Sequence, residues 1–458
     1  MAKNLKENSS KKAALDYHEF PQPGKLEIRA TKPLANQRDL SRAYSPGVAE
    51  ACLEIKEDEN TASKYTSKGN LVAVISNGTA VLGLGNIGPG ASKPVMEGKA
   101  VLFKKFANID CFDIEVDEDN PQRLAEIVSS LEPTFGAINL EDIKAPDCFE
   151  VERLCKEKMK IPVFHDDQHG TAIVVGAAAV NAIELSNRKI ENTKIVAVGA
   201  GASGIACLEM LVKLGAKREN IWLSDSKGLI TKNRSEINEE KKRFSQDSTL
   251  SNLDDVIKDC DMFLGLSGPG VLTSKMVLKM NKQPIIFALA NPDPEINPAD
   301  ALKVAPDALI ATGRSDYPNQ VNNVLCFPFI FRGALDVGAT QINDEMKLAC
   351  IHAIANLARQ TSTAETVEAY QGEILKFGKE YLIPKPFDPR LLPNVAVAVA
   401  EAAMKSGVAS RPLKDVEAYK QKLEGSVYKS TILMKPVFEA AKTSSRKIVF
   451  AEGEDERT

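Results

Sequence analysis

Residues 194–225, KIVAVGAGASGIACLEMLVKLGAKRENIWLSD, decide the fold. A first apolar run, 194–198, is followed by a glycine-rich turn, an apolar helical segment and a second apolar run that ends at Asp225. The residues of the turn are Gly199, Ala200, Gly201, Ala202, Ser203 and Gly204. A strand, a GxGxxG turn, a helix and a strand with an acidic end are together typical of a dinucleotide-binding Rossmann unit. The turn residues are therefore expected to receive a pyrophosphate at the helix N-terminus.

The rest of the chain indicates an α/β protein with two domains. From residue 194 to about 330, apolar strands alternate with helical segments, which predicts a doubly wound parallel sheet with helices on both faces. Residues 21–165 mix shorter strands and helices. We place an N-terminal α/β domain at 1–168, a Rossmann-type domain at 169–395 and C-terminal helices packed on the body at 396–430.

Local signals predict three details within this plan. Asn77-Gly78 between the runs 71–76 and 80–84 predicts a β-hairpin. Pro94 is expected to open a helix that reaches residue 107. Residues 344–423 are expected to be mostly helical, with a proline-rich break at 383–393.

The composition is that of a soluble globular protein. The 458 residues include 58 Lys and Arg and 62 Asp and Glu, a net charge of −4, so no basic surplus indicates nucleic-acid binding. Residues 1–12 lack the apolar core of a signal peptide, and the longest apolar stretch, 171–183, is too short to span a membrane. None of the eight cysteines forms a CxxC pair. We expect a cytoplasmic protein without nucleic-acid or membrane partners.

The residues after the second strand bear on the choice of dinucleotide. A lone carboxylate at this position commonly binds the ribose 2′-hydroxyl of NAD. Here Ser226 and Lys227 follow Asp225 directly, and a hydroxyl beside a cation can receive the 2′-phosphate of NADP. We therefore favour NADP, with Asp225, Ser226 and Lys227 at its adenosine end. The alternative is that Lys227 is a solvated residue of a turn.

Three carboxylates at the ends of apolar runs predict a metal site. Glu141 and Asp142 follow the run 135–140, and Asp167 follows the run 162–164. Clustered carboxylates repel one another unless a cation neutralises them, and hard oxygen ligands suit Mg²⁺ or Mn²⁺. The alternative is three separate caps or salt bridges.

Two other patterns match a motif only in part. His165 and His169 have the i, i+4 spacing of an HExxH zinc hydrolase, but the second position is Asp166. Gly170 is expected to interrupt any helix there, so a zinc site is disfavoured. Residues 83–88 repeat the GxGxxG pattern without a following apolar helix, so we interpret them as a structural loop near a site.

An ordered set of motifs resembles the malic enzymes, in particular the bacterial NADP-dependent form. The motifs are Tyr44-Ser45-Pro46-Gly47-Val48, Gly98-Lys99, Asn139-Leu140-Glu141-Asp142, residues 164–171, residues 199–204, Ala290-Asn291-Pro292 and Asn322-Asn323-Val324. The resemblance covers about residues 20–425. It implies an N-terminal substrate and dimerisation domain, a dinucleotide domain after it, and a homodimer or higher homo-oligomer.

The resemblance also implies a reaction. The reaction is oxidative decarboxylation of L-malate to pyruvate and CO₂ with reduction of NADP⁺. Glu141, Asp142 and Asp167 are the implied ligands of Mg²⁺ or Mn²⁺, which acts as a Lewis acid. Lys99 is the implied general base and Tyr44 the implied general acid.

Four further residues take their roles from the same resemblance. Asp166 is expected to orient Lys99. Asn291 is expected near the nicotinamide and the substrate, and Asn323 near the substrate. Larger members of the family bind the substrate carboxylate with an arginine where this chain has Ala80, so that contact must be made otherwise.

Residues 446–458 begin a new strand and resemble the opening of a phosphotransacetylase domain. The longer bacterial malic enzymes carry such a domain as a regulatory, acyl-CoA-responsive tail. We therefore expect 431–458 to be a linker and the first strand of a truncated domain, and acyl-CoA regulation only where the whole domain is present.

Two other functions were weighed against the decarboxylase. A metal-dependent hydrolase would be built on His165 and His169, but the intact dinucleotide motif argues against it. A non-catalytic dinucleotide sensor would need neither Tyr44 and Lys99 nor the three carboxylates. The oxidative decarboxylase is the function that all the motifs favour together.

Overall fold

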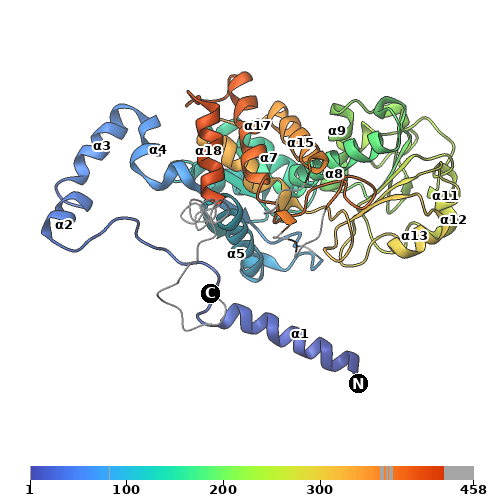
Figure 1. Ribbon diagram of the computed structural model, residues 1–458, viewed down its shortest axis with the longest axis horizontal. Coiled ribbons are helices and arrows are strands. Elements are labelled where there is room, and N and C mark those ends of the chain that lie inside the picture. The colour runs from blue at the N-terminus through green and yellow to red at the C-terminus, as the bar shows by residue number, and fades with distance from the viewer. Residues whose placement is uncertain (1, 82, 362–365, 368–369, 371–374, 428–458) are drawn as a thin grey trace, which may run out of the picture.

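The computed structural model describes residues 2–81, 83–361, 366–367, 370 and 375–427 (Figure 1). These residues form two largely parallel β-sheets covered by helices, which confirms the predicted α/β fold class. The expected linker and strand at 431–458 lie outside the described residues, and so do residues 428–430 of the expected C-terminal helices. The predicted domain boundaries stay predictions. No described helix has the length and apolar character needed to cross a membrane.

The first sheet has four parallel strands in the order β2-β1-β3-β4. The strands are β1 (Leu71–Ser76), β2 (Asp110–Glu115), β3 (Ala137–Leu140) and β4 (Val163–His165). Alternate residues of β1 face opposite sides. Val72 and Val74 pack toward α5 (Gly88–Ala107), while Ala73 and Ile75 pack toward α6 (Pro121–Ser130) and α7 (Asp147–Lys158). The sheet is therefore covered on both faces.

Two local predictions for this region are wrong. The described residues of the predicted second strand, 80–81 and 83–84, do not pair with β1, because β2 and β3 already occupy both of its edges. Asn77-Gly78 instead turns the chain toward the end of β3, where Ala80 N–H donates to the Asp142 carbonyl at 2.9 Å. Helix α5 begins at Gly88 rather than Pro94, with Pro89 in its first turn, where a missing N–H costs no hydrogen bond.

The second sheet has six strands in the order β10-β9-β8-β5-β6-β7. All neighbours are parallel except the short β7, which runs antiparallel to β6. The strands are β5 (Ile195–Val198), β6 (Ile221–Asp225), β7 (Gly228–Leu229), β8 (Met262–Gly265), β9 (Ile285–Ala288) and β10 (Leu309–Thr312). The predicted alternation of strands and helices from residue 194 onward is confirmed.

Helices cover both faces of this sheet (Figure 1). One face packs on α8 (Asp166–Leu185) and α9 (Ala202–Lys213). The other packs on the short helices α11 (Leu253–Val256), α12 (Ser274–Val277) and α13 (Pro298–Val304), while α10 (Glu239–Lys242) follows β7. Helix α8 starts directly after β4 and packs on the second sheet, and residues 186–194 lead from its end to β5.

Four described helices that follow the second sheet in the chain pack on the body. They are α14 (Phe327–Asp336), α15 (Asp344–Arg359), α17 (Leu391–Lys405) and α18 (Val416–Val427). Helix α15 contacts α8, α17 contacts α14 and α15, and α18 contacts α17. The prediction of mostly helical structure at 344–423 is confirmed for the described part of that range. The predicted break at 383–393 ends earlier than expected, because α17 begins at Leu391 and includes Pro393.

Most of the N-terminal segment stands apart from the body, although Lys25 contacts α5 (Figure 1). It contains α1 (Ala2–Glu19), α2 (Gln37–Ala43), α3 (Val48–Glu57) and α4 (Ala62–Tyr65). No residue from 11 to 70 is buried, although the segment is rich in large apolar side chains such as Ile28 (88% exposed) and Tyr44 (74% exposed). We call residues 26–66 the N-terminal arm. Apolar side chains concentrated on an exposed arm are typical of a surface that another chain covers.

Candidate active site

The predicted carboxylates meet at one edge of the first sheet. Strands β3 and β4 are parallel neighbours, so their carboxyl ends lie side by side, and Glu141 and Asp142 follow one while Asp167 follows the other. Asp142 lies in the left-handed backbone region (φ 52°), which turns the chain sharply after the strand. One oxygen from each carboxylate lies within 4.8 Å of the other two, which brings together the three residues of the predicted metal site.

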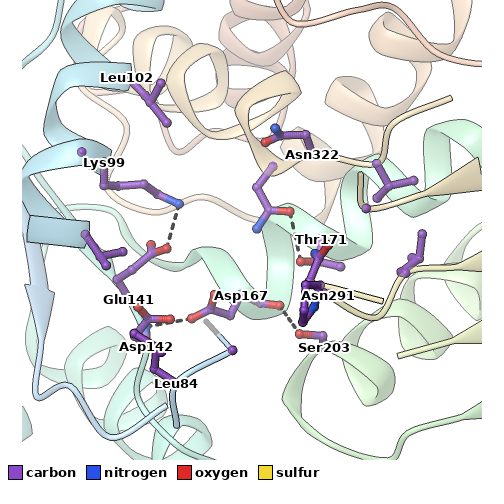
Figure 2. Close-up of a pocket in the computed structure, with 18 of the residues that line it drawn as sticks. Leu84, Lys99, Leu102, Glu141, Asp142, Asp167, Thr171, Ser203, Asn291 and Asn322 are labelled. Atoms are coloured by element: carbon purple, nitrogen blue, oxygen red, sulfur yellow. Dashed lines mark hydrogen bonds and ion pairs between the residues drawn. The ribbon is translucent and has the colours of Figure 1, made fainter. Parts of the chain in front are cut away.

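Hydrogen bonds hold this cluster in place (Figure 2). Asn139 Nδ2 donates to Glu141 Oε2 at 2.8 Å, and the Asp142 N–H donates to Asp167 Oδ2 at 2.8 Å. Ser203 Oγ, in the first turn of α9, donates to the main-chain carbonyl of Asp167 at 2.7 Å. The carboxylates are therefore fixed both within the first sheet and to the glycine-rich turn of the second.

The electrostatics of the cluster fit a divalent cation. Burial is the main cause that raises the pKa of Asp142 to about 9, of Glu141 to about 7 and of Asp167 to about 6. Repulsion from neighbouring carboxylates adds to this rise, and the charge of Lys99 offsets only part of it. Three hard oxygen donors that resist ionisation together are the donor set that Mg²⁺ or Mn²⁺ neutralises.

Lys99 projects from α5 toward the same carboxylates (Figure 2). Its Nζ lies 2.8 Å from Glu141 Oε1, 2.5 Å from Asp166 Oδ2 and 4.2 Å from the centroid of the Phe327 ring. Burial alone would lower the pKa of Lys99, but the charges of Asp166 and Glu141 outweigh it and raise this pKa above its ordinary value. Lys99 therefore carries its proton in this arrangement, contrary to the lowered pKa expected from burial.

Asp166 contacts Lys99 and a second residue of the site, Asn323. Its side chain is completely buried, and its Oδ2 accepts from both Lys99 Nζ and, at 3.0 Å, Asn323 Nδ2. Gly170 makes room for this carboxylate, because a Cβ there would lie 1.9 Å from Asp166 Oδ1. The expectation that Asp166 orients Lys99 agrees with this geometry. The expectation that Gly170 interrupts the helix is wrong, because α8 runs through it from Asp166.

A cavity of about 1100 Å³ opens over these groups. Seven residues singled out in the sequence line it, which are Lys99, Glu141, Asp142, Asp167, Ser203, Asn291 and Asn323. Thr171 and Asn322 line it too, and Thr171 Oγ1 donates to Asn323 Oδ1 at 3.1 Å. Figure 2 shows the carboxylates and Lys99 on one side of this space and Asn291 and Ser203 on the other. The cavity thus lies between the carboxylate edge of the first sheet and the loops of the second.

The glycine-rich turn has the geometry that a dinucleotide requires. Gly199 has a positive φ (106°), and a Cβ there would lie 2.2 Å from the Leu266 carbonyl. A Cβ at Gly204 would lie 1.9 Å from the Gly199 carbonyl, so this glycine lets the helix pack close to the strand. A Cβ at Gly201 would meet nothing within 4 Å. Open space over Gly201 at the N-terminus of α9 fits a bound pyrophosphate.

Two parts of the chain match models of known protein domains. Residues 23–126 match the N-terminal domain of malic enzyme, and residues 168–370 match its NAD-binding domain. The crystal structure of malic enzyme from Pyrococcus horikoshii Ot3 is 40% identical to this chain, with a TM-score of 0.83. The match covers 94% of this chain and 98% of that one. The chain belongs to the malic enzyme family.

Curated malic enzymes of bacteria are similar to the chain over nearly its whole length. The NADP-dependent malic enzyme of Haemophilus influenzae is 59% identical over 449 residues, which is 98% of this chain and 59% of the relative. The NAD-dependent malic enzyme of Rhizobium meliloti is 60% identical over 446 residues, which is 97% of this chain and 58% of the relative. The chain therefore spans 58–59% of the length of these two malic enzymes.

Tyr44, the general acid implied by resemblance to the malic enzymes, is not in the cavity. It follows α2 in the N-terminal arm, its side chain is 74% exposed, and it does not line the pocket that holds Lys99. Figure 1 shows α2 and α3 well away from α5. Within one chain, the structure does not bring the two implied proton-transfer residues together.

The residues expected at the adenosine end lie at the carboxyl end of β6, outside the cavity lining. Asp225 is bound by Arg234 and Lys241, two cations that the sequence analysis missed. Lys227 contributes its N–H to Asp225, but its ammonium pairs with Glu236. No motif points to Arg234 or Lys241, and the one available signal is the basic residues that recur between 232 and 243.

The loop at 83–88 lies near the site, as expected. Gly83 and Leu84 line the cavity, and Gly83, Gly85 and Gly88 all have positive φ. Ala80, which replaces the arginine of larger malic enzymes, offers no charge. Lys25 is the other cationic side chain among the described lining residues. It was not singled out in the sequence, because its place beside the cavity depends on packing against α5.

The two histidines of the partial zinc motif do not form a metal site. His165 ends β4 and His169 lies in α8, so they do not share a helix face. His169 Nε2 contacts Glu152 Oε1 at 2.8 Å, and its Nδ1 lies 3.3 Å from Lys347 Nζ. Among the residues that the structure describes, the one cluster suited to a metal is Glu141, Asp142 and Asp167. The hydrolase alternative therefore finds no support.

Proposed function

We propose that this chain catalyses the oxidative decarboxylation of L-malate to pyruvate and CO₂ with reduction of NADP⁺. One observation carries the proposal. A single cavity places a carboxylate cluster suited to a divalent cation and a buried lysine opposite Asn291 and the glycine-rich turn. A 2-hydroxy acid held at the carboxylates would then face a dinucleotide bound on the second sheet.

Glu141, Asp142 and Asp167 would hold Mg²⁺ or Mn²⁺. Such a cation supplies Lewis-acid stabilisation of negative charge on the C2 oxygen of the substrate. The chain's own contribution is to fix the three carboxylates through Asn139, the Asp142 N–H and Ser203. Burial makes the charge interactions in this site stronger than they would be in water.

Lys99 is the proposed general base. It accepts the proton of the C2 hydroxyl as hydride leaves C2, and the β-keto acid that results loses CO₂. The raised pKa of Lys99 comes from Asp166 and Glu141, so a dication held at Glu141 would remove part of that cause and would favour the neutral amine that a base requires. Asp166 and Asn323 keep the amine aimed into the cavity.

Tyr44 is the proposed general acid, which protonates C3 of the enol of pyruvate. Because Tyr44 lies on the exposed N-terminal arm and not at the cavity of its own chain, we infer that it serves the cavity of a second copy. The arm's exposed apolar side chains, which include Ile28, Leu34 and Leu53, would be buried in such a homodimer. Protons balance, because Lys99 takes one from oxygen and Tyr44 returns one to carbon.

Lys25 is the proposed partner of the substrate carboxylate remote from the metal. It lines the cavity, and its Nζ donates to the Pro94 carbonyl at 2.6 Å, which leaves two further ammonium protons. Burial lowers the pKa of Lys25, and Glu97 and Asp113 offset part of that effect. A lysine here supplies the charge that Ala80 does not.

The deciding experiment follows malate-dependent reduction of NADP⁺ and NAD⁺ in parallel by the absorbance of the reduced nicotinamide. Assays contain Mn²⁺ or Mg²⁺, and matched assays contain a chelator. Metal-dependent turnover with pyruvate as product and a preference for NADP⁺ is the expected result. Preference for NAD⁺ would retain the reaction and reject the cofactor assignment, and dinucleotide binding without turnover would favour a sensor.

A further inference from the structure

The carboxylate at the end of β6 is saturated with hydrogen bonds. Asp225 Oδ1 accepts from the Lys227 N–H at 2.9 Å and from Arg234 Nη1 at 2.9 Å. Asp225 Oδ2 accepts from Arg234 Nη2 at 3.1 Å and from Lys241 Nζ at 2.9 Å. A carboxylate offers about four lone-pair positions in all. Asp225 therefore has no acceptor left for the ribose 2′-hydroxyl that a lone acidic residue here would bind.

The same group of residues carries a positive charge. We call Asp225, Arg234 and Lys241 the Asp225 cluster. One carboxylate and two cations give it a net charge of +1, and its hydrogen bonds outweigh burial and lower the pKa of Asp225 to about 2, so this charge persists at neutral pH. Lys241 uses one ammonium proton on Asp225, and two have no partner among the described residues. Its side chain remains 25% exposed and accessible to a ligand.

The cluster lies beside the glycine-rich turn. Strand β6 is the parallel neighbour of β5, and the Gly199 N–H donates to the Ser224 carbonyl at 2.9 Å. In a Rossmann unit, the end of this second strand is where the adenosine ribose lies. A phosphate on the ribose 2′-oxygen would therefore meet the Asp225 cluster.

Lys227, the cation expected from the sequence, is placed for a different role. Its Nζ lies 2.8 Å from Glu236 Oε2, and both side chains are well exposed, at 64% and 79%. This ion pair is neutral and solvated. Lys241, by contrast, is directed inward by Asp225, and Arg234 is fixed further by the carbonyls of Gly228 and Leu229.

We propose that Lys241, supported by Arg234, binds the 2′-phosphate of NADP and determines the preference for NADP over NAD. The proposal rests on the proposed use of a nicotinamide dinucleotide. Asp225 acts as a positioning residue that holds both cations at the ribose and denies the 2′-hydroxyl of NAD an acceptor. NADP differs from NAD by this one phosphate dianion, which is the group that Lys241 and Arg234 would recognise.

Calorimetric titration with 2′,5′-ADP and with 5′-AMP tests the proposal without turnover. Wild-type protein should bind 2′,5′-ADP the more tightly. Lys241→Gln should weaken 2′,5′-ADP binding by about tenfold or more, the usual value of a charged hydrogen bond, and leave 5′-AMP binding unchanged. Lys242→Gln is the matched control, because Lys242 is the next residue, is exposed and pairs with Glu239.

Each other outcome overturns the proposal. The role of Lys241 would be rejected if the wild type bound both nucleotides with equal affinity. It would also be rejected if Lys241→Gln weakened the binding of both nucleotides equally, or if Lys227→Gln, rather than Lys241→Gln, weakened 2′,5′-ADP binding. Failure of this inference can be distinguished from failure of the proposed reaction. Malate oxidation with an unaltered cofactor preference in Lys241→Gln would reject this inference alone, whereas selective loss of 2′,5′-ADP binding in a protein without malate oxidation would reject only the reaction.

Discussion

Replacement of Lys99 by methionine tests the core of the proposed site. Methionine keeps the length of the side chain and removes its charge. In the native protein, Lys99 Nζ lies 2.8 Å from Glu141 Oε1 and 2.5 Å from Asp166 Oδ2, and the lysine side chain is only 10% exposed. The substitution therefore leaves two buried carboxylates without their cation.

The magnitude follows from this geometry. Removing one partner of a buried ion pair costs about 3–5 kcal/mol, because the remaining charge stays desolvated. The two pairs share one cation, so their costs do not add, and a carboxylate can escape part of the penalty by protonation. We expect Lys99→Met to lower the free energy of unfolding by about 3 kcal/mol at neutral pH without metal. Turnover should fall by about 10²–10⁴ or more, as for loss of a general base.

Urea unfolding in the presence of chelator measures the first effect, and the malate assay measures the second. Lys104→Met is the matched control on the same helix, because Lys104 pairs with Asp110 at 2.8 Å with both side chains about half exposed. Such a surface pair contributes about 1 kcal/mol or less. Equal destabilisation by the two substitutions would refute the buried ion-pair argument, and normal turnover in Lys99→Met would refute the assignment of the base.

Three further predictions follow from the site. In metal-free protein, folded Asp167, Glu141 and Asp142 titrate at pKa values of about 6, 7 and 9, above those of unfolded carboxylates, so the melting temperature should fall as pH rises from 6 to 9. Saturating Mn²⁺ should remove this slope, and a flat metal-free profile would contradict the electrostatics. Mixed dimers of Tyr44→Phe and Lys99→Met should regain about a quarter of wild-type activity, because half the dimers contain one intact site. No recovery would show that Tyr44 does not act across subunits. Lys25→Met should raise the KM for malate, whereas Lys68→Met, outside the cavity lining, should not; equal effects would exclude Lys25 from the substrate site.

The carboxylate cluster could be predicted because its residues follow neighbouring parallel strands. Glu141 and Asp167 are separated by 26 positions in the sequence, but β3 and β4 bring their strand ends together. Similarly, the glycine-rich turn could be recognised because all its residues are consecutive and its strand, helix and acidic end follow at set distances. In both cases, the residues directly before each functional side chain form a recognisable strand or turn, and that element determines where the side chain lies.

Other features depend on contacts with residues that are distant in the sequence, and short sequence motifs do not contain those contacts. Asn77-Gly78 predicts a hairpin, but no hairpin partner can pair with β1, because β2 and β3 already pair with both of its edges. Gly170 lies within α8 because its missing Cβ accommodates Asp166, a packing requirement that helix propensity does not represent. Lys227 and Lys241 are equally plausible phosphate ligands by residue type. Only the fold shows that the nearer one in sequence pairs with Glu236 and the farther one reaches Asp225.

The hydrogen bond from Ser203 Oγ to the Asp167 carbonyl has a thermodynamic consequence. Asp167 belongs to the carboxylate cluster and Ser203 to the glycine-rich turn, so this hydrogen bond joins the proposed sites of the ion and the dinucleotide. If one ligand fixes Ser203 and Asp167 in position, the second ligand no longer has to supply the conformational entropy cost of fixing them. Such coupling is reciprocal, so each ligand should tighten the binding of the other by the same free energy.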